Sequence, residues 1–230
     1  MRTLFIIPAR AGSKGIIKKN TRILAGKPLV VHTLLLSRMF SSDNSICVTT
    51  DDPEVVDAVA EQGYKVPFIR PADLSNDSAS MRDVMLHALN HYNRFRDEYN
   101  KIVLLQPTSP FRQSEDIFRS LSLYKESLDM VVTVMETKAN PYSVLYEENE
   151  EGFLAKSKTG NFTSRQETPK VWQLNGAVYV INAKSLQEKP ISEFTKVKKV
   201  EMDQLHSIDL DTEIDWKFAE LLNEEYKILH

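Results

Sequence analysis

Short apolar runs alternate with amphipathic segments along the first two thirds of the chain. Runs of strand length lie at residues 3–7, 45–50, 64–69, 102–105 and 130–134. Between them, apolar residues recur at helical spacing in segments that start near Pro28, Pro53, Met81 and Ile117. Strands that alternate with helices are typical of βαβ units, so the pattern predicts an α/β fold with a mainly parallel sheet.

This alternation stops near Lys138. Residues 140–173 are polar, contain two Pro and two Gly residues, and show no helical period. More than thirty such residues would form an unusually long loop inside a compact domain. We therefore expect residues 138–175 to form an extended β arm that leans on a neighbour, most simply a second copy of the chain. An apolar strand at 177–181 and a helix over about 214–226 are expected after the arm.

The length of 230 residues and the hydrophobic content of 42% fit a single domain over residues 1–230, with the arm inserted in it. The one cysteine, Cys47, lies in an apolar run and predicts neither a disulfide framework nor a metal–cysteine cluster. No run approaches the roughly 20 apolar residues of a membrane helix, and the first apolar run is too short for a signal peptide. These features predict a cytoplasmic protein with no membrane partner.

Charge is distributed unevenly along the chain. Residues 1–42 hold eight Lys or Arg residues and no Asp or Glu, whereas the rest of the chain holds 21 cations against 32 acids. Several of these cations lie in or beside residues 9–15, which read Ala9-Arg10-Ala11-Gly12-Ser13-Lys14-Gly15. Glycine lets backbone amides approach phosphate oxygens, while Lys and Arg neutralise the charge. We interpret this glycine loop, residues 9–15, as part of a nucleoside triphosphate site.

Two other interpretations of the cationic segment remain open. A loop rich in Gly, Ser and Lys is often only a solvated turn, and this one matches neither the Walker A nor the dinucleotide-binding pattern. The other alternative is a nucleic-acid-binding module. The segment contains only two aromatic residues, Phe5 and Phe40, both in apolar runs, so no platform for base stacking is visible and no nucleic-acid partner is expected.

Polar residues follow several of the predicted strands. Arg10, Asp51, Arg70 and Gln106 each come just after a strand-like run. Ligands of parallel α/β sheets bind at the carboxyl ends of the strands. We therefore expect these four side chains to gather at one edge of the sheet.

Asp209 and Asp211 form the sharpest candidate pair. If they lie at the end of a strand, both carboxylates share one face about 7 Å apart. Such an arrangement suits a hard divalent cation held by one or two carboxylates and substrate phosphates. In the alternative interpretation, Asp211 caps a helix, or Thr212 and Asp215 form a capping box.

The remaining polar candidates are weaker. Arg165 and Lys138 lie in or beside the polar arm, where a solvated surface cation is the default and a clamp for a substrate carboxylate is the alternative. His87 and His91 lie one helical turn apart, but no third metal ligand is apparent. The chain has no Gly-x-Ser-x-Gly and no His-Glu-x-x-His motif, which favours direct displacement without a covalent enzyme intermediate.

These motifs form an ordered set that spans nearly the whole chain. The blocks lie at residues 7–15, 19–20, 70–74, 77–80, 104–112, 165–169, 175–179 and 207–213. Together they resemble the CMP-sialic acid synthetases, or N-acylneuraminate cytidylyltransferases, and the first and last blocks are the most specific. The resemblance implies a Rossmann-like, three-layer nucleotidyltransferase fold and a homodimer in which the arm is exchanged between subunits.

The resemblance also implies a reaction and a set of site residues. The reaction transfers CMP from CTP to the anomeric hydroxyl of a nine-carbon acidic sugar and releases pyrophosphate. By matching position, the catalytic residues are Arg10, Lys19 and Asp211. The nucleotide site comprises Ala9, Arg10, Ala11, Gly12, Ser13, Lys14, Gly15, Lys19, Asn20, Arg70 and Ser80. Sugar contacts are implied for Gln106, Lys138, Arg165 and Gln173, and Mg²⁺ (or Mn²⁺) ligation for Asp209 and Asp211.

Two departures from related patterns affect this expectation. Met81 stands where the family pattern has a small polar residue. The related Kdo synthetases usually have an acidic Gly-Asp motif where this chain has residues 106–108, Gln-Pro-Thr, which counts against Kdo as the sugar. The alternatives left open are legionaminic acid, pseudaminic acid or Kdn as the sugar, and a metal-dependent glycosyltransferase in which the two aspartates bind a sugar nucleotide.

Overall fold

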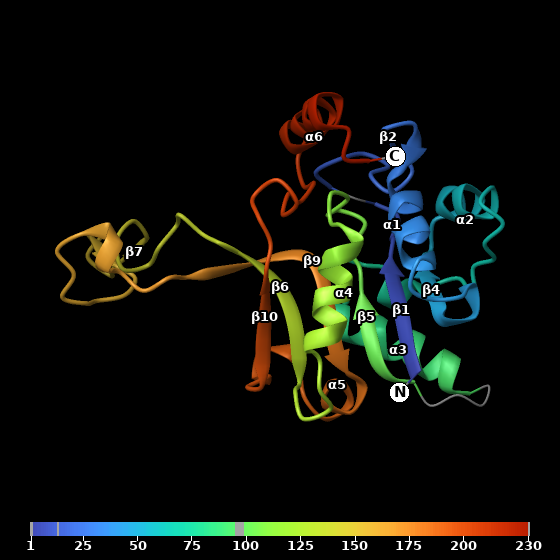
Figure 1. The fold of residues 1–230 in the computed structure, drawn as a ribbon, viewed down its shortest axis with the longest axis horizontal. Coiled ribbons are helices and arrows are strands. Elements are labelled where there is room, and N and C mark those ends of the chain that lie inside the picture. The colour runs from blue at the N-terminus through green and yellow to red at the C-terminus, as the bar shows by residue number, and fades with distance from the viewer. Residues whose placement is uncertain (1, 13, 95–98, 230) are drawn as a thin grey trace.

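The computed structural model describes residues 2–12, 14–94 and 99–229, except for the side chain of Arg165. A six-stranded sheet runs through the centre of the molecule in the order β10-β6-β9-β5-β1-β4 (Figure 1). Its strands are β1 (Arg2–Pro8), β4 (Ile46–Thr49), β5 (Tyr99–Leu104), β6 (Met130–Glu136), β9 (Trp172–Asn182) and β10 (Val197–Glu201). Only β9 runs antiparallel to its neighbours, so the expected mainly parallel sheet is confirmed.

Helices cover both faces of this sheet and make the three expected layers. They are α1 (Leu29–Arg38), α2 (Pro53–Ala60), α3 (Met81–Asn93), α4 (Ser114–Leu123) and α5 (Ala183–Glu188), whereas α6 (Glu213–Tyr226) lies beyond one end of the sheet (Figure 1). In β1, Phe5 and Ile7 face a core shared with α1, α2 and α4, while Leu4 and Ile6 face one shared with α3 and α5. This alternation follows from the twofold side-chain period of a strand buried on both faces. No described helix is long and apolar enough to cross a membrane.

One predicted strand near β4 does not form, and the edge strand β10 was not predicted. Residues 64–69 do not form a strand and contribute one isolated bridge, between Thr50 and Ile69. Pro67 interrupts this run and cannot donate a ladder hydrogen bond. Conversely, β10 was not predicted, because its sequence is lysine-rich and polar. Lysine is common on sheet edges, where it discourages pairing with other chains.

The helix starts follow local capping chemistry. The Asp52 carboxylate caps α2 by accepting from the backbone N–H of Glu54, and Pro53 begins the helix, as predicted. Ser80 caps α3, and its hydroxyl oxygen accepts from the backbone N–H of Asp83 at 3.1 Å.

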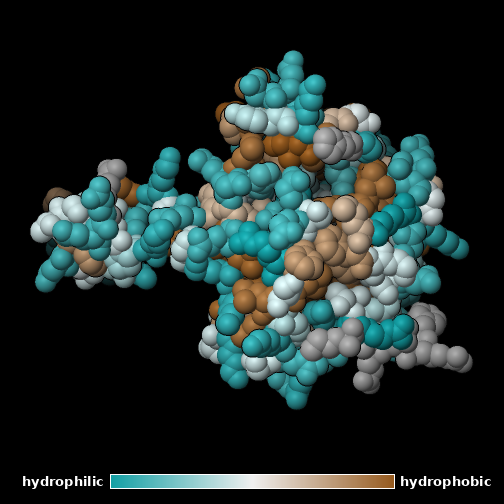
Figure 2. Space-filling model, in the orientation of Figure 1, coloured by the Kyte–Doolittle hydropathy of each residue, from teal (hydrophilic) through white to brown (hydrophobic). Residues whose placement is uncertain are grey.

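The arm, residues 138–175, projects well away from the rest of the molecule (Figure 1). It contains a two-stranded hairpin, β7 (Tyr146–Glu148) with β8 (Leu154–Lys156), and a short 3₁₀ turn, η3 (Arg165–Glu167). Figure 2 shows it as a separate lobe with apolar side chains among hydrophilic ones. Its exposed large apolar residues are Val144, Leu145, Tyr146, Phe153, Leu154, Phe162 and Leu174.

A smaller apolar cluster joins the two ends of the chain above the sheet. Trp216 of α6 is fully buried there against Ile16, Leu29 and Leu210. The short hairpin of β2 (Ile23–Leu24) and β3 (Lys27–Pro28) contributes Leu24 to the same cluster. Figure 1 shows α6 and this hairpin at the end of the sheet toward which β1 runs.

Asp129 ties together three segments at the opposite end of the sheet. Its carboxylate is almost fully buried and accepts from Ser185 Oγ at 2.7 Å, from the Lys189 ammonium at 3.2 Å, and from the backbone N–H groups of Thr195 and Lys196. These donors, the Lys196 N–H first, hold the pKa of Asp129 far below its ordinary value. We expect Asp129→Asn to lower the free energy of unfolding at pH 7 by about 1–3 kcal/mol, measured by urea denaturation.

The sign of the pH dependence follows from the depressed pKa. The folded state favours ionised Asp129, so its stabilising effect is present above the unfolded pKa of about 3.9. That effect is lost as the pH falls through the lower pKa of the folded state. The stability gap between wild type and Asp129→Asn should therefore narrow in acid, whereas exposed Asp57→Asn should leave stability within about 0.5 kcal/mol of wild type. A gap that is constant from pH 7 to pH 2 would contradict this account.

Candidate active site

A cavity of about 540 Å³ opens at the carboxyl ends of the parallel strands. It brings together the cationic N-terminal segment and the two aspartates near the other end of the chain. Residues that line it are Pro8, Arg10, Lys14, Gly15, Lys19, Asn20, Arg70, Met81, Gln106, Pro107, Thr108, Asp209 and Asp211. Nine of these residues were predicted from the sequence to contact nucleotide, sugar or metal.

Backbone contacts fix the glycine loop at the mouth of this cavity. The N–H of Ala11 donates to the Asp51 carboxylate at 2.9 Å, and the N–H of Ala9 donates to the carbonyl of Thr49 at 3.0 Å. The Asn20 amide donates to the carbonyl of Arg10 at 3.1 Å. Of the predicted landmarks, Asp51 therefore positions the loop rather than lining the cavity.

Three predicted nucleotide residues of this loop do not line the cavity themselves. Ala9 is fully buried, and the backbone N–H of Ala11 donates to Asp51, which holds the loop in place. Gly12 has φ +71°, in the left-handed region that favours glycine, so it turns the loop. Ser13 lies outside the described residues.

The loop meets the aspartate segment directly. Lys19 Nζ donates to the carbonyl of Leu210 at 2.7 Å and to Asp211 Oδ1 at 3.2 Å. A Cβ atom on Gly15 would lie 1.9 Å from the carbonyl oxygen of Asp211, so only glycine permits this approach. The segment that carries the aspartates is irregular, so the expectation that Asp209 and Asp211 lie at the end of a strand is wrong.

The capping alternative is resolved by the start of α6. Thr212 is the N-cap, and its side chain and that of Asp215 form a capping box. Asp211 precedes this cap and is not needed for it. Its side chain is 71% exposed and paired only with Lys19 among the described residues. The carboxylate is therefore available to a ligand.

Asp209 has the properties of a metal ligand or a ligand-facing acid. Its Oδ1 is buried and has no hydrogen-bond partner among the described residues. Burial raises the pKa of Asp209 above its ordinary value, and the charge of Asp211 adds to this, while a hydrogen bond with Thr108 and the charge of Lys19 oppose it. A cation would satisfy the orphaned oxygen and relieve the repulsion between the carboxylates.

The carboxylates of Asp209 and Asp211 fit a magnesium ion that also binds substrate phosphates. The described residues contain no group of three His, Cys, Asp or Glu side chains able to hold a metal. Mg²⁺ is commonly held by one or two carboxylates together with substrate phosphates and waters. Asp209 and Asp211 supply those two carboxylates beside a cation-lined cavity.

The cations of the cavity differ in their surroundings. Arg70 is 4% exposed; its Nε donates to Thr49 Oγ1 at 3.1 Å and its Nη2 to the Thr49 carbonyl. Burial lowers the pKa of Arg70, and nearby Asp51 opposes that effect. Arg10 and Lys14 are more exposed and both pair with Asp77, at 2.7 and 2.5 Å.

The predicted sugar-contacting residues do not gather at one place. Gln106 lines the cavity, whereas Lys138 lines a separate hollow of about 480 Å³ at the base of the arm. Gln173 is exposed on β9. The side chain of Arg165 lies outside the described part of the chain. Ser80, predicted to contact the nucleotide, directs its hydroxyl to Asp83 Oδ2 at 2.7 Å as part of the α3 cap.

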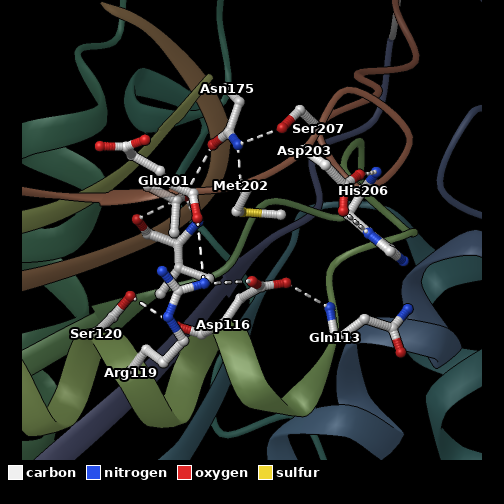
Figure 3. A network of polar contacts seen from close by, with 12 residues as sticks. Gln113, Asp116, Arg119, Ser120, Asn175, Glu201, Met202, Asp203, His206 and Ser207 are labelled. Atoms are coloured by element: carbon white, nitrogen blue, oxygen red, sulfur yellow. Dashed lines mark hydrogen bonds and ion pairs between the residues drawn. The ribbon is translucent and has the colours of Figure 1, made fainter. Parts of the chain in front are cut away.

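Sequence reasoning missed a buried network that supports Asp209. The Asn175 side chain accepts from Thr133 Oγ1 at 2.8 Å and donates to Ser207 Oγ at 3.0 Å, two residues before Asp209. Figure 3 shows this amide between Ser207 and Met202. Asn175 thereby fastens the aspartate segment to the centre of the sheet. No local pattern signals this link, because its partners are distant in sequence.

Arg112 gives comparable support to the loop that carries Gln106. It is 3% exposed, and its guanidinium donates to the carbonyls of Ser109 and Ala177, at 3.0 and 2.8 Å, and to that of Gln106. Burial lowers its pKa to about 9, while the charge of Asp209 opposes the shift. The sequence marked Arg112 only as the last residue of a motif.

The fold is similar to that of solved structures. The structure of a CMP:2-keto-3-deoxy-manno-octonic acid synthetase complexed with CTP is similar, with a TM-score of 0.70 and 19% sequence identity, over 98% of this chain and 100% of that chain. The 4-diphosphocytidyl-2C-methyl-D-erythritol synthase of Anaerococcus prevotii has a TM-score of 0.67 and 16% sequence identity. The match covers 97% of this chain and 98% of that chain. At these identities the likeness concerns the fold.

Curated proteins related by sequence have higher sequence identity to this chain than those solved structures do. The CMP-N,N'-diacetyllegionaminic acid synthase of Legionella pneumophila is 34% identical over 97% of each chain. The N-acylneuraminate cytidylyltransferase of Escherichia coli is also 34% identical, over 95% of this chain and 52% of its own length. The pseudaminic acid cytidylyltransferase of Campylobacter jejuni is 25% identical over the whole of this chain.

A family-level match covers almost every element described above. The profile of the family described as Cytidylyltransferase matches residues 4–228, which include the glycine loop, Arg70, Gln106 and both aspartates. With this match and the full-length relatives, the chain belongs to the cytidylyltransferase family and is a nucleotidyltransferase.

Proposed function

We propose that this protein activates a nine-carbon acidic sugar with CTP, giving the CMP-sugar and pyrophosphate. The observation that carries this proposal is the shared cavity, in which an acid-free cationic segment meets Asp209 and Asp211. Such a site suits a triphosphate with its cation. The names of the relatives, which concern N-acylneuraminate, diacetyllegionaminate and pseudaminate, support a nonulosonic acid as acceptor.

The proposed reaction is a direct displacement. The anomeric oxygen of the sugar forms a bond to the α-phosphorus of CTP, the bond to the bridging oxygen breaks, and pyrophosphate leaves with that oxygen. Arg10, Lys19 and the backbone amides of Gly12, Lys14 and Gly15 stabilise charge on the triphosphate, and Arg70 lies toward the cytidine. Asp211, the exposed carboxylate, takes the proton of the sugar hydroxyl.

The two aspartates would hold the magnesium ion in this proposal. When bound, the ion would neutralise phosphate charge in the transition state. The buried Oδ1 of Asp209 supports this assignment, because it is otherwise desolvated without a partner. Lys19, 12% exposed and fastened to Leu210 and Asp211, keeps a cation beside them.

The arm supplies the proposed dimer contact. An isolated two-stranded hairpin is marginally stable in water, and this one exposes Phe153 and Leu154 at 66% and 70%. Burial against a second copy of the chain would remove that apolar surface from water. We propose that Lys138 and Arg165, on the arm, thereby reach the sugar site of the partner subunit, together with Gln173 at its base.

We propose two closely related sugars as candidates for the acceptor. N-acetylneuraminate is the first candidate, from the sequence motifs. N,N'-diacetyllegionaminate is the second, favoured by a relative that matches this chain over 97% of both lengths. Both sugars carry the carboxylate that the cationic residues are proposed to bind, and they differ in acyl and hydroxyl substituents.

The proposal is tested by pyrophosphate release. With CTP, Mg²⁺ and each sugar in turn, we expect release that depends on both the sugar and the metal, and a saturable dependence on CTP. EDTA should abolish it, and ATP, GTP and UTP serve as nucleotide controls. Consumption of a CMP-sugar without pyrophosphate release would instead indicate a glycosyltransferase. Failure with every nonulosonic acid, in the presence of tight CTP binding, would contradict the proposed acceptor class.

A further inference from the structure

Asp77 occupies two cations of the proposed triphosphate site. Its Oδ1 pairs with Arg10 Nη2 at 2.7 Å and its Oδ2 with Lys14 Nζ at 2.5 Å, so both carboxylate oxygens are used. Arg10 and Lys14 line the cavity. The side chains of Arg10, Asp77 and Lys14 are 35%, 51% and 79% exposed, which leaves the three groups accessible from solvent.

The turn that carries Asp77 is built independently of these ion pairs. Asn76 Oδ1 accepts from the N–H groups of Ser78 and Ala79, at 2.9 and 3.0 Å, and its amide donates to the carbonyl of Asp73 at 2.8 Å. Beyond Ala79, the Ser80 cap starts α3. Local hydrogen bonds therefore hold Asp77 beside the glycine loop, and the carboxylate does not rely on the cations for its place.

A carboxylate in this position resembles a phosphate group. It presents two anionic oxygens to the same guanidinium and ammonium groups that would bind a phosphate. The pairs with Lys14 and Arg10 lower the pKa of Asp77, so it stays ionised at neutral pH. A triphosphate that engages Arg10 and Lys14 would meet this negative charge at close range and be repelled by it.

We infer that Asp77 determines nucleotide affinity by competing with phosphate oxygens for Arg10 and Lys14. This inference rests on the proposed function, which places the triphosphate against these two cations. On entry, CTP exchanges the carboxylate contacts for phosphate contacts, and no covalent bond changes. After transfer, Asp77 takes back the two cations as pyrophosphate departs. It thereby weakens ground-state binding of both polyanions and shortens the residence of the product.

The test compares Asp77→Asn with Asp73→Asn. Asp73 lies in the same turn and gives the same change in net charge, but among the described residues its carboxylate forms no ion pair with Arg10 or Lys14. We expect Asp77→Asn to lower the Kd of CTP and the inhibition constant of pyrophosphate by about 3- to 10-fold relative to Asp73→Asn at low salt, with the difference shrinking at high salt. Calorimetry with CTP and pyrophosphate, each with Mg²⁺, measures this.

The outcomes separate this inference from the proposed function. If wild type binds CTP, but Asp77→Asn binds it no more tightly than Asp73→Asn does, the inference is overturned and the proposed function is not. Absence of CTP binding by folded wild type would overturn the proposed function. Asp77→Ala is the second variant, because it removes the hydrogen-bonding oxygens as well; weaker binding by Asp77→Ala and Asp77→Asn alike would show that Asp77 positions the cations and would also overturn the inference.

Discussion

Replacing Asp211 with asparagine is expected to lower the rate of CMP transfer by at least about 100-fold, with a much smaller effect on CTP binding. The substitution keeps the size of the side chain and one oxygen but removes the charge that would hold the metal and accept the sugar proton. Asp211 does not cap α6, since Thr212 does, so the fold should tolerate the change. Steady-state pyrophosphate release and equilibrium CTP binding measure the two effects separately.

Asp57→Asn is the matched control for this experiment. It removes the same charge from an exposed position on α2, outside the cavity. Turnover and CTP affinity of this control should equal those of wild type. If Asp211→Asn retained turnover within a few-fold of wild type, neither the metal role nor the base role of Asp211 would stand. A matching loss of thermal stability would shift the explanation to folding.

Gly15→Ala is expected to abolish CTP-dependent activity and to destabilise the fold by about 1–3 kcal/mol or more. The new methyl group would lie 1.9 Å from the carbonyl oxygen of Asp211, and that neighbour is backbone, which cannot rotate away. The glycine loop and the aspartate segment must then separate. This lengthens the contacts that Lys19 makes with Leu210 and Asp211. Thermal unfolding and CTP titration follow the two consequences.

Gly26→Ala provides the comparison for this substitution. Gly26 has φ +79° in the turn between β2 and β3, and a Cβ atom added there would have no described atom within 4 Å beyond its chain neighbours. Alanine there should lower the free energy of unfolding by about 1 kcal/mol, because a residue with a Cβ atom is strained in the left-handed conformation. It should leave the CTP affinity unchanged. Equal CTP affinities for Gly15→Ala and wild type would show that close approach of the two segments is unnecessary for nucleotide binding.

The nucleotide side of the site was predictable because its signals are local. Arg10, Lys14 and Lys19 stand in a segment without acids, directly after a strand whose carboxyl end faces the ligand edge of the sheet. Asp209 and Asp211 were identified by their spacing, although the reasoning through a strand was wrong. Their carboxylates meet the glycine loop through an irregular segment that Leu210 anchors in the core.

The supporting residues were not predictable in the same way. Arg112 contacts Ala177, 65 residues away in the sequence, and Asn175 contacts Thr133, 42 residues away. Neither contact leaves a periodic pattern in the sequence. The run at 64–69 has strand-like composition, but Pro67 interrupts it and only the bridge between Thr50 and Ile69 is described. Lys138 matched the motif of a sugar-binding residue, yet the projecting arm places it at a different hollow of its own chain.

The junction between Lys19 and Asp211 spans 192 positions of the chain. During synthesis, the glycine loop leaves the ribosome long before the aspartate segment exists, so a nascent chain cannot assemble the complete site until residues 209–211 have been synthesised. A polypeptide truncated before residue 207 would keep the cationic loop without its acidic counterpart. The contact between these two distant segments thus delays nucleotide binding until the aspartate segment has emerged and folded against the glycine loop.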